Sequence, residues 1–207
     1  PRPGRAGGAA VVPDRCPELA DPARTVLGAE QERWLDRQLG RAATRWNLIG
    51  QQSLLAPLRM PGRDGAPDRI RTDGWDGYPG SRQRLIAALA GHRVSNPVVL
   101  GGDLHAFFVA DVHQDPQRES PVVASEFVVT SVSSQASDAA HYARLRAANR
   151  HLRHADGSQR GYLMVTLQGD RLEADLMGLD DVTREDSGIR RQAGFVVEAG
   201  RPGARPV

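Results

Sequence analysis

The stretch Asn96-Pro97-Val98-Val99-Leu100-Gly101-Gly102-Asp103-Leu104-His105 decides the fold, because a short apolar run ends there in two glycines, an aspartate and a histidine. The run follows a proline and is rich in β-branched residues, which favours a buried strand over a helix. Ligands of open α/β sheets gather at the carboxyl ends of such strands. On extended backbone, Asp103 and His105 would point to the same side. A carboxylate and an imidazole together suit a divalent or trivalent metal.

The same two residues also allow a purely structural interpretation. An aspartate after a strand commonly caps the next turn, and a single histidine is commonly a hydrogen-bonded structural residue. Spacing alone leaves both interpretations open.

The composition excludes several classes of protein. The chain has 207 residues, 40% of them hydrophobic, which is enough for a core, and no apolar run approaches the ~20 residues that span a bilayer. All 27 basic residues are arginines scattered among 25 acidic ones, without a basic and aromatic stripe, so we expect no nucleic acid as a specific partner. Cys16 is the single cysteine, which excludes an intrachain disulfide and a cysteine zinc cluster.

Both ends of the chain lack hydrophobic periodicity. Residues 1–20 are rich in Pro, Gly, Ala and Arg and are expected to be an irregular segment or linker, and residues 204–207 a tail. The chain begins with Pro1 rather than Met and shows no secretory leader, so we expect a processed N-terminus or a part of a longer protein.

Between these ends, helical and strand patterns alternate as far as Asp103. Helical spacing predicts helices over residues 28–44 and 81–92, and residues 46–53 lean towards a strand that ends in two amides. This alternation implies parallel βαβ pairing. The later part is predicted to contain strands at 106–112, 127–133 and 194–199, a helix at 139–149, and a hairpin formed by 160–168 and 171–177.

Several polar residues beyond the first motif are candidates for a site. Asp73, Trp75, Asp76 and Tyr78 lie just before a helix and could shape a substrate mouth or cap that helix and fill a loop core. Arg82 could meet an anionic substrate or be a solvated surface charge.

The remaining candidates are one acid, four histidines and a group of serines. Glu126 lies on a predicted strand and must be paired if buried, so it could orient His105 or bridge to an arginine. His113, His141, His151 and His154 lack metal-ligand spacing and are expected at the surface. The serines at 131, 133 and 134 form no Gly-x-Ser-x-Gly elbow, which argues against a serine hydrolase.

Seven segments in order carry a resemblance to a known family. With these segments the chain resembles the PhoD-like alkaline phosphatase D family of the metallophosphatase (calcineurin-like phosphoesterase) superfamily, over residues 21–203. The matching segments are 21–28, 46–52, 73–79 with Arg82, 99–107, 123–127 with 130–134, 149–153 with 160–162, and 195–200.

The resemblance implies an α/β fold, the C-terminal half of a four-layer αββα sandwich with mixed sheets and flanking helices. It implies that Asp103 and His105 bind metal, His105 also acting in catalysis, and that Gln51 or Gln52 sits where relatives often place a histidine ligand; we favour Gln52 as lining the site. The implied cofactors are calcium and iron. The implied reaction is hydrolysis of a phosphate ester by a metal-bound water, in a secreted or periplasmic enzyme.

Part of the family pattern has no counterpart in the sequence. The early aspartate motif, the Gly-Asp motif and the asparagine ligand of metallophosphatases precede the matched region. We therefore expect the missing N-terminal half to complete the metal site in the parent protein. The alternative is a non-catalytic fragment or binding module that retains half of a site, because one Asp and one His are too few ligands for a bimetallic cluster.

Overall fold

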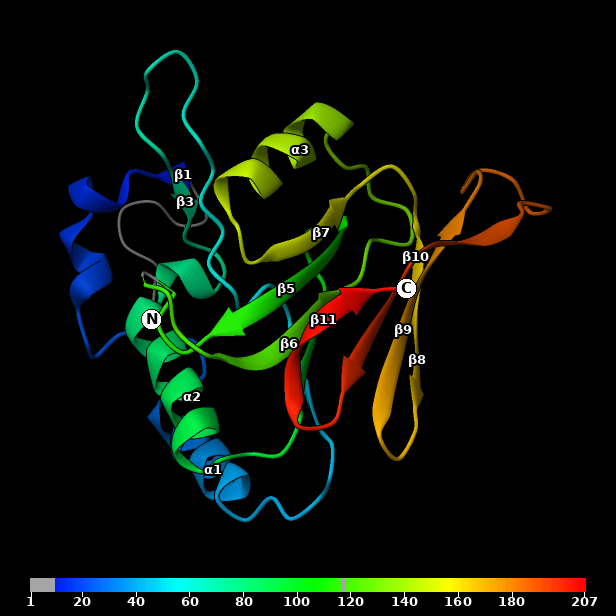
Figure 1. Cartoon of the computed structure of the whole chain (residues 1–207). Helices are drawn as coiled ribbons and strands as arrows, with labels where there is room; N and C mark the ends of the chain where they lie inside the picture. Colours follow the sequence, from blue (N-terminus) through cyan, green and yellow to red (C-terminus); the bar gives the residue numbers. More distant parts are fainter. Residues whose placement is uncertain (1–9, 117) are drawn as a thin grey trace.

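The computed structural model describes residues 10–116 and 118–207, which form two large β-sheets, a two-stranded sheet and three α-helices (Figure 1). The larger sheet has the strand order β2-β4-β6-β5-β7. Strands β2, β4 and β6 are parallel, whereas β5 is antiparallel to β6 and β7. The strands are β2 (Asn47–Gly50), β4 (Pro97–Gly101), β5 (Phe107–His113), β6 (Val122–Val128) and β7 (Leu152–Asp156).

The smaller sheet is antiparallel, with the order β11-β10-β9-β8. Its strands are β8 (Gly161–Leu167), β9 (Arg171–Leu179), β10 (Ile189–Glu198) and β11 (Arg201–Pro206). The predicted hairpin of 160–168 and 171–177 is therefore confirmed. The expected tail at 204–207 is wrong, because Ala204 is buried in β11 and its N–H donates to Asp111.

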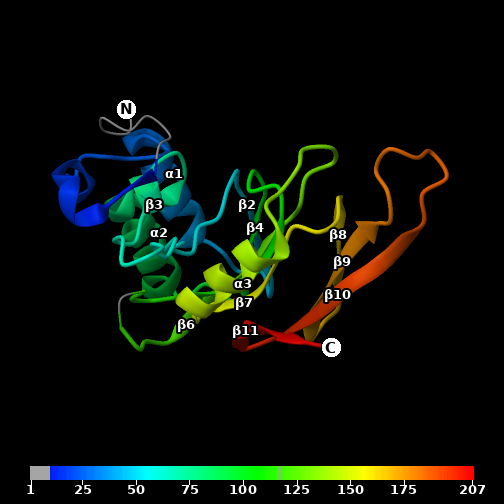
Figure 2. The same cartoon turned by 90° about the horizontal axis from the view of Figure 1, so that it is seen from above.

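The two sheets pack face to face through alternating side chains. From the larger sheet come Val98, Phe107, Val109 and Phe127, and from the smaller sheet come Leu172, Ala174, Leu176, Phe195, Val197 and Ala204. Figure 2 shows the smaller sheet on one side of the larger sheet and helices α1 and α2 on the other. These layers correspond to three of the four layers of an αββα sandwich.

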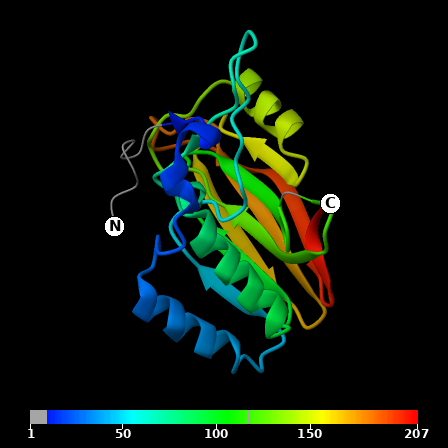
Figure 3. The same ribbon diagram turned by 90° about the vertical axis from the view of Figure 1, so that its left-hand side faces the viewer.

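Helices cover the second face of the larger sheet (Figure 3). Helix α1 (Ala29–Leu39) and helix α2 (Pro79–Gly91) share one apolar cluster with Val99, Val112 and Ala124. Helix α3 (Ala139–Ala148) shares a second cluster with Phe108, Ala110 and Val128. Helix α1 is shorter than the predicted 28–44, ending at Leu39 before Gly40.

One predicted strand is displaced along the chain. Residues 127–133 were expected to be extended, but β6 spans Val122–Val128. Its parallel neighbour β4 ends at Gly101, whose carbonyl accepts the N–H of Val129. Beyond that point residues 130–133 have no partner strand in the part of the chain described, so β-branched residues alone do not keep them in the sheet.

Short elements lie before α1 and again between β2 and α2. Strand β1 (Ala10–Val11) pairs with β3 (Ile70–Arg71), and η1 (Pro13–Arg15), η2 (Pro17–Ala20) and η3 (Trp75–Gly77) are single 3₁₀ turns. The expectation of an irregular segment over 1–20 thus falls partly on residues 1–9, outside the described residues. Within the described ranges, no helix has the length and apolar character needed to cross a membrane.

The intersheet core predicts a large difference between two leucines on neighbouring strands. Leu176 on β9 is fully buried, whereas Leu167 on β8 is 48% exposed. We expect Leu176→Ala to lower the free energy of unfolding by about 2–5 kcal/mol, because it leaves a cavity between the sheets. Leu167→Ala should change it by less than about 1 kcal/mol. Urea denaturation measures both values; equal losses would contradict this account of the core.

Candidate functional site

The turn after β4 holds the two residues of the first motif in a strained conformation. Asp103 has φ 70° and His105 has φ 57°, so both lie in the left-handed region, which is uncommon for residues other than glycine. The prediction that both side chains point to one side assumed an extended backbone, and this assumption is wrong. The structure nevertheless brings both side chains to the same pocket. Such strain persists where the surroundings impose it, and it clusters at functional sites.

The loop after β2 imposes the shape of this turn. The N–H of Gly102 donates to the carbonyl of Gln52 at 3.1 Å. A Cβ atom added at Gly101 would lie 2.2 Å from the carbonyl oxygen of Ser53, so only glycine permits this approach. The two loops that follow neighbouring parallel strands are therefore in direct contact.

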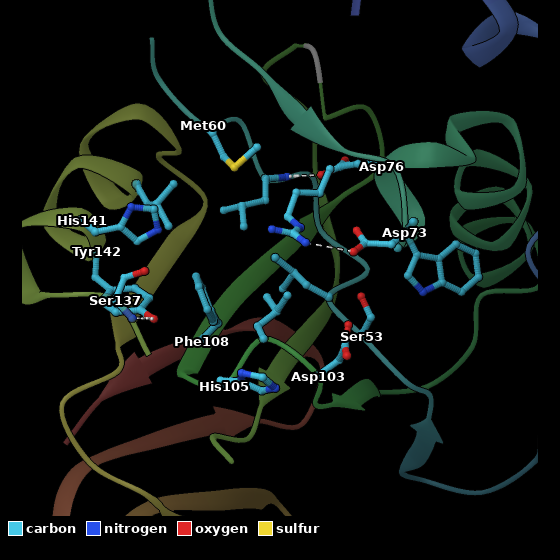
Figure 4. A pocket seen from close by; sticks show the side chains of 17 residues that line it. Ser53, Met60, Asp73, Asp76, Asp103, His105, Phe108, Ser137, His141 and Tyr142 are labelled. Carbon is cyan, nitrogen blue, oxygen red and sulfur yellow. Dashed lines mark hydrogen bonds and ion pairs between the residues drawn. The ribbon is translucent and has the colours of Figure 1, made fainter. Parts of the chain in front are cut away.

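A pocket of about 500 Å³ opens beside these loops (Figure 4). One part of its wall is polar and contains Ser53, Arg71, Asp73, Asp76, Asp103 and His105. Another part is largely apolar and contains Leu54, Leu58, Met60, Phe108, Tyr142 and Leu145. The predicted residues Asp73, Trp75, Asp103 and His105 thus line one pocket.

The side chains of Asp103 and His105 are exposed and unengaged. Within the described ranges, neither forms a hydrogen bond or an ion pair. The backbone of His105 is held by Thr130, whose hydroxyl donates to the His105 carbonyl at 3.2 Å. A carboxylate and an imidazole are therefore presented to the pocket on a fixed backbone, free to bind a ligand.

The other acids of the polar wall are already paired. Asp73 lies 3.2 Å from Arg71 in an exposed ion pair. Asp76 forms a buried ion pair with Arg82 and also accepts the N–H of Leu58 at 2.9 Å. Arg82 is 8% exposed, so its interpretation as a solvated surface charge is wrong, and its guanidinium is engaged with Asp76.

Two predicted residues lie away from the pocket lining. Tyr78 is buried with its ring 4.8 Å from the guanidinium of Arg24, and the exposed Gln52 takes part through its backbone carbonyl. Gln51 is the glutamine that contacts the pocket wall. Its Oε1 accepts the indole N–H of Trp75 and the N–H of Ser53, both at 2.9 Å.

Glu126 is buried, but its partners differ from those expected. Its carboxyl group accepts the N–H of Leu55 at 2.6 Å and the N–H of Ala56 at 2.8 Å. Among the described residues it forms no hydrogen bond to His105 or to an arginine, so both expected roles are wrong. Burial raises the pKa of Glu126 to about 7, against the opposing effect of the two N–H donors.

Sequence reasoning missed the wall that α3 contributes. Ser137, His141 and Tyr142 line the pocket, although His141 was expected at the surface. Burial and the nearby Arg144 lower the pKa of His141. The capping residue Asp138, which accepts the N–H of His141, could have located the helix start, but no sequence signal places α3 beside residues 103–105.

His151 and His154 are half-buried rather than exposed at the surface. His151 is hydrogen-bonded through Nε2 to the carbonyl of Pro57 at 2.8 Å. His154 packs against the ring of Phe195, with 5.8 Å between the ring centroids. Neither lines the pocket.

The described residues supply only part of a metal site. No group of three or more His, Cys, Asp or Glu side chains that could hold a metal ion occurs within 10–116 and 118–207. Asp103 and His105 provide one oxygen and one nitrogen ligand, whereas structural and catalytic metal sites generally take three or more protein ligands. A complete site at this position would need ligands from elsewhere.

Comparisons with known proteins agree on one family. The family model described as PhoD-like phosphatase matches residues 4–176. Alkaline phosphatase D of Bacillus subtilis (strain 168) is 34% identical over 194 residues, which are 92% of this chain and 33% of that protein. A solved structure entitled "Structure of PhoD" superposes with a TM-score of 0.89 at 31% identity, covering 98% of this chain and 39% of that one. The chain thus spans about a third of its curated relative.

The two acids of the pocket wall predict contrasting effects on stability. Asp76→Asn leaves the Arg82 guanidinium buried without its counter-charge, which should lower the free energy of unfolding by about 3–5 kcal/mol. Asp73→Asn breaks only an exposed pair and should change it by less than about 1 kcal/mol. Thermal and urea unfolding of both variants test this difference. Similar values for the two would show that the Asp76–Arg82 pair does not stabilise the wall.

Proposed function

The chain belongs to the PhoD-like phosphatase family, and from this premise we propose that it forms one wall of a metal-dependent phosphoester hydrolase site. The observation that carries the proposal is the pair Asp103 and His105: among the described residues neither side chain has a partner, and both line one pocket from a strained turn after β4. We further propose that the remaining ligands come from sequence outside residues 1–207.

The charges of the polar wall support the need for a cation. Asp73 and Asp76 each have an arginine partner, whereas Asp103 has no ion-pair partner within residues 10–116 and 118–207. A phosphate ester is itself anionic and would be repelled by this carboxylate in a partly desolvated pocket. A bound cation between them would remove that repulsion, and we propose calcium and iron as the metals.

Asp103 and His105 would then have different roles in the site. Asp103 would hold a metal through its carboxylate. His105 would either complete the ligand set or hydrogen-bond a phosphoryl or leaving-group oxygen, since its ring nitrogens have no other partner in the described structure. The metals, when bound, would neutralise charge on the phosphoryl oxygens and activate the attacking water. Ser53 and Asp73 would border the entrance on the same wall.

The incomplete ligand set favours a second candidate for the chain by itself. Because the described residues do not assemble three metal ligands, the chain alone could be a non-catalytic part or a binding module. The two candidates differ in whether a longer protein that contains this chain turns over substrate.

Asp103→Asn is the sharpest test, because Asn tolerates the left-handed backbone and removes only the charge. In a longer protein that supplies the remaining ligands, we expect hydrolysis of chromogenic phosphate monoesters and diesters, at alkaline pH with calcium and iron, to fall about 100-fold or more in this variant. Asp170→Asn, in the exposed turn between β8 and β9, is the matched control and should keep full activity. Calorimetric titration with calcium should show weakened binding only for Asp103→Asn.

Each other outcome has a defined meaning. Equal activity of the longer protein with and without the Asp103→Asn substitution would reject Asp103 as part of the site. We expect no turnover by residues 1–207 alone, and turnover by them would reject the proposal that further ligands are needed. An inactive but folded longer protein would favour the non-catalytic candidate.

A further inference from the structure

Glu126 lies where an irregular segment, rather than a helix, covers the larger sheet. Its neighbours on the same face of β6 are Ala124, in the cluster beneath α1 and α2, and Val128, in the cluster beneath α3. The segment after β2 crosses between these clusters: Leu55 belongs to the first, and Leu54 and Ala56 to the second. Glu126 therefore lies where the backbone of the segment after β2 packs against the larger sheet.

The contacts of Glu126 fasten that segment. The carboxyl group accepts two successive backbone N–H groups, those of Leu55 and Ala56, and the amide of Gln51 approaches it at 3.4 Å. Buried N–H groups without acceptors would destabilise the segment strongly. Ser53, Leu54 and Leu58 of the same segment form part of the pocket wall.

The charged groups that act on Glu126 come from the elements around it. Arg82 on α2 lowers its pKa and Asp76 on η3 raises it, and these two form an ion pair with each other. The residues opposite Glu126 on β4 and β5, Val99 and Ala110, are uncharged. His151 bonds the same segment at Pro57, and burial lowers its pKa.

We propose that Glu126 is a positioning residue: it holds residues 51–58 on the sheet so that they form the pocket wall. The role of this pocket as an active site rests on the proposed function. The clamp, by which we mean the contacts of Glu126 with residues 51–58, does not depend on it. Burial raises the pKa of Glu126 to about 7 in the closed segment, whereas solvent would return it towards its ordinary 4.5 on opening. The closed form then binds more protons, so rising pH favours opening between these two values.

Amide hydrogen exchange on the chain tests this clamp without substrate or metal. After correction for intrinsic rates, protection of the Leu55 and Ala56 amides should fall about tenfold or more between pH 5 and pH 7.5. Burial lowers the pKa of His151, so titration of this group would increase protection as pH rises. This effect is the same in the unchanged chain and in every variant. In Glu126→Gln, protection should be lower at pH 5 and should lose the fall with pH, because the variant has no proton to release and one acceptor fewer.

Two controls keep the test decisive. Glu185→Gln, an exposed acid in the loop between β9 and β10, should leave the exchange of Leu55 and Ala56 unchanged. The amides of Leu172 and Leu176 in the smaller sheet serve as an internal reference, so the unchanged chain alone gives an answer if Glu126→Gln does not fold. Protection that is constant or rises with pH in the unchanged chain, or an identical pH slope in Glu126→Gln, would overturn the proposal.

Discussion

The parallel pairing of β2, β4 and β6 sends the three segments that follow these strands to one edge of the larger sheet. The first of these segments carries Ser53, the second carries Asp103 and His105, and the third leads to α3 with His141. Hydrogen bonds from Gly102 to Gln52 and from Val129 to Gly101 join neighbouring segments where they leave the sheet. The pocket is therefore a product of topology, because residues far apart in sequence meet only through this pairing.

Buried polar side chains stabilise the irregular part of this edge. Residues 51–59 form no helix or strand, yet they cover apolar sheet surface and cannot satisfy their own backbone groups. Glu126, Asp76 and Asn149, from three different elements, accept the N–H groups at positions 55, 56, 58 and 59. Asn149 also donates to the carbonyl of Arg59. Each of these polar groups therefore substitutes for a secondary-structure hydrogen bond, which explains why charged residues occur inside the core.

Hydrophobic periodicity and glycine positions predicted most of the elements. The strand before Asp103, the hairpin of β8 and β9 and helix α3 all follow from local patterns, because their residues alternate or repeat at a regular period. The strand β11 was not predictable in this way: Arg201–Pro206 contains two prolines, and it is extended because β10 offers a partner and Asp111 an acceptor. Contacts with β10 and Asp111, rather than the local sequence, determine the extended conformation of Arg201–Pro206.

Only the part of the candidate site that is formed by residues close together in the sequence was predictable. Asp103 and His105 follow a recognisable strand, whereas the partners of Arg82 and Glu126 depend on a loop that carries no periodic signal. Asp and His adopt the left-handed region more readily than most residues, but this tendency does not single out positions 103 and 105. Long-range packing, which a single sequence does not encode in its local pattern, accounts for both gaps.

The strand order of the two sheets has a consequence for how the chain folds. In the smaller sheet every strand pairs with its neighbour in sequence, so each pairing closes only a short loop. In the larger sheet, Asn47 pairs with Pro97, about fifty residues away, and β6 inserts between β4 and β5. The pocket is lined by Ser53, which follows β2, and by Asp103 and His105, which follow β4. It can therefore form only after β2 and β4 have paired, which is among the slowest steps of folding. A partly folded chain with only its smaller sheet in place would have a meander with an exposed apolar face and no binding site.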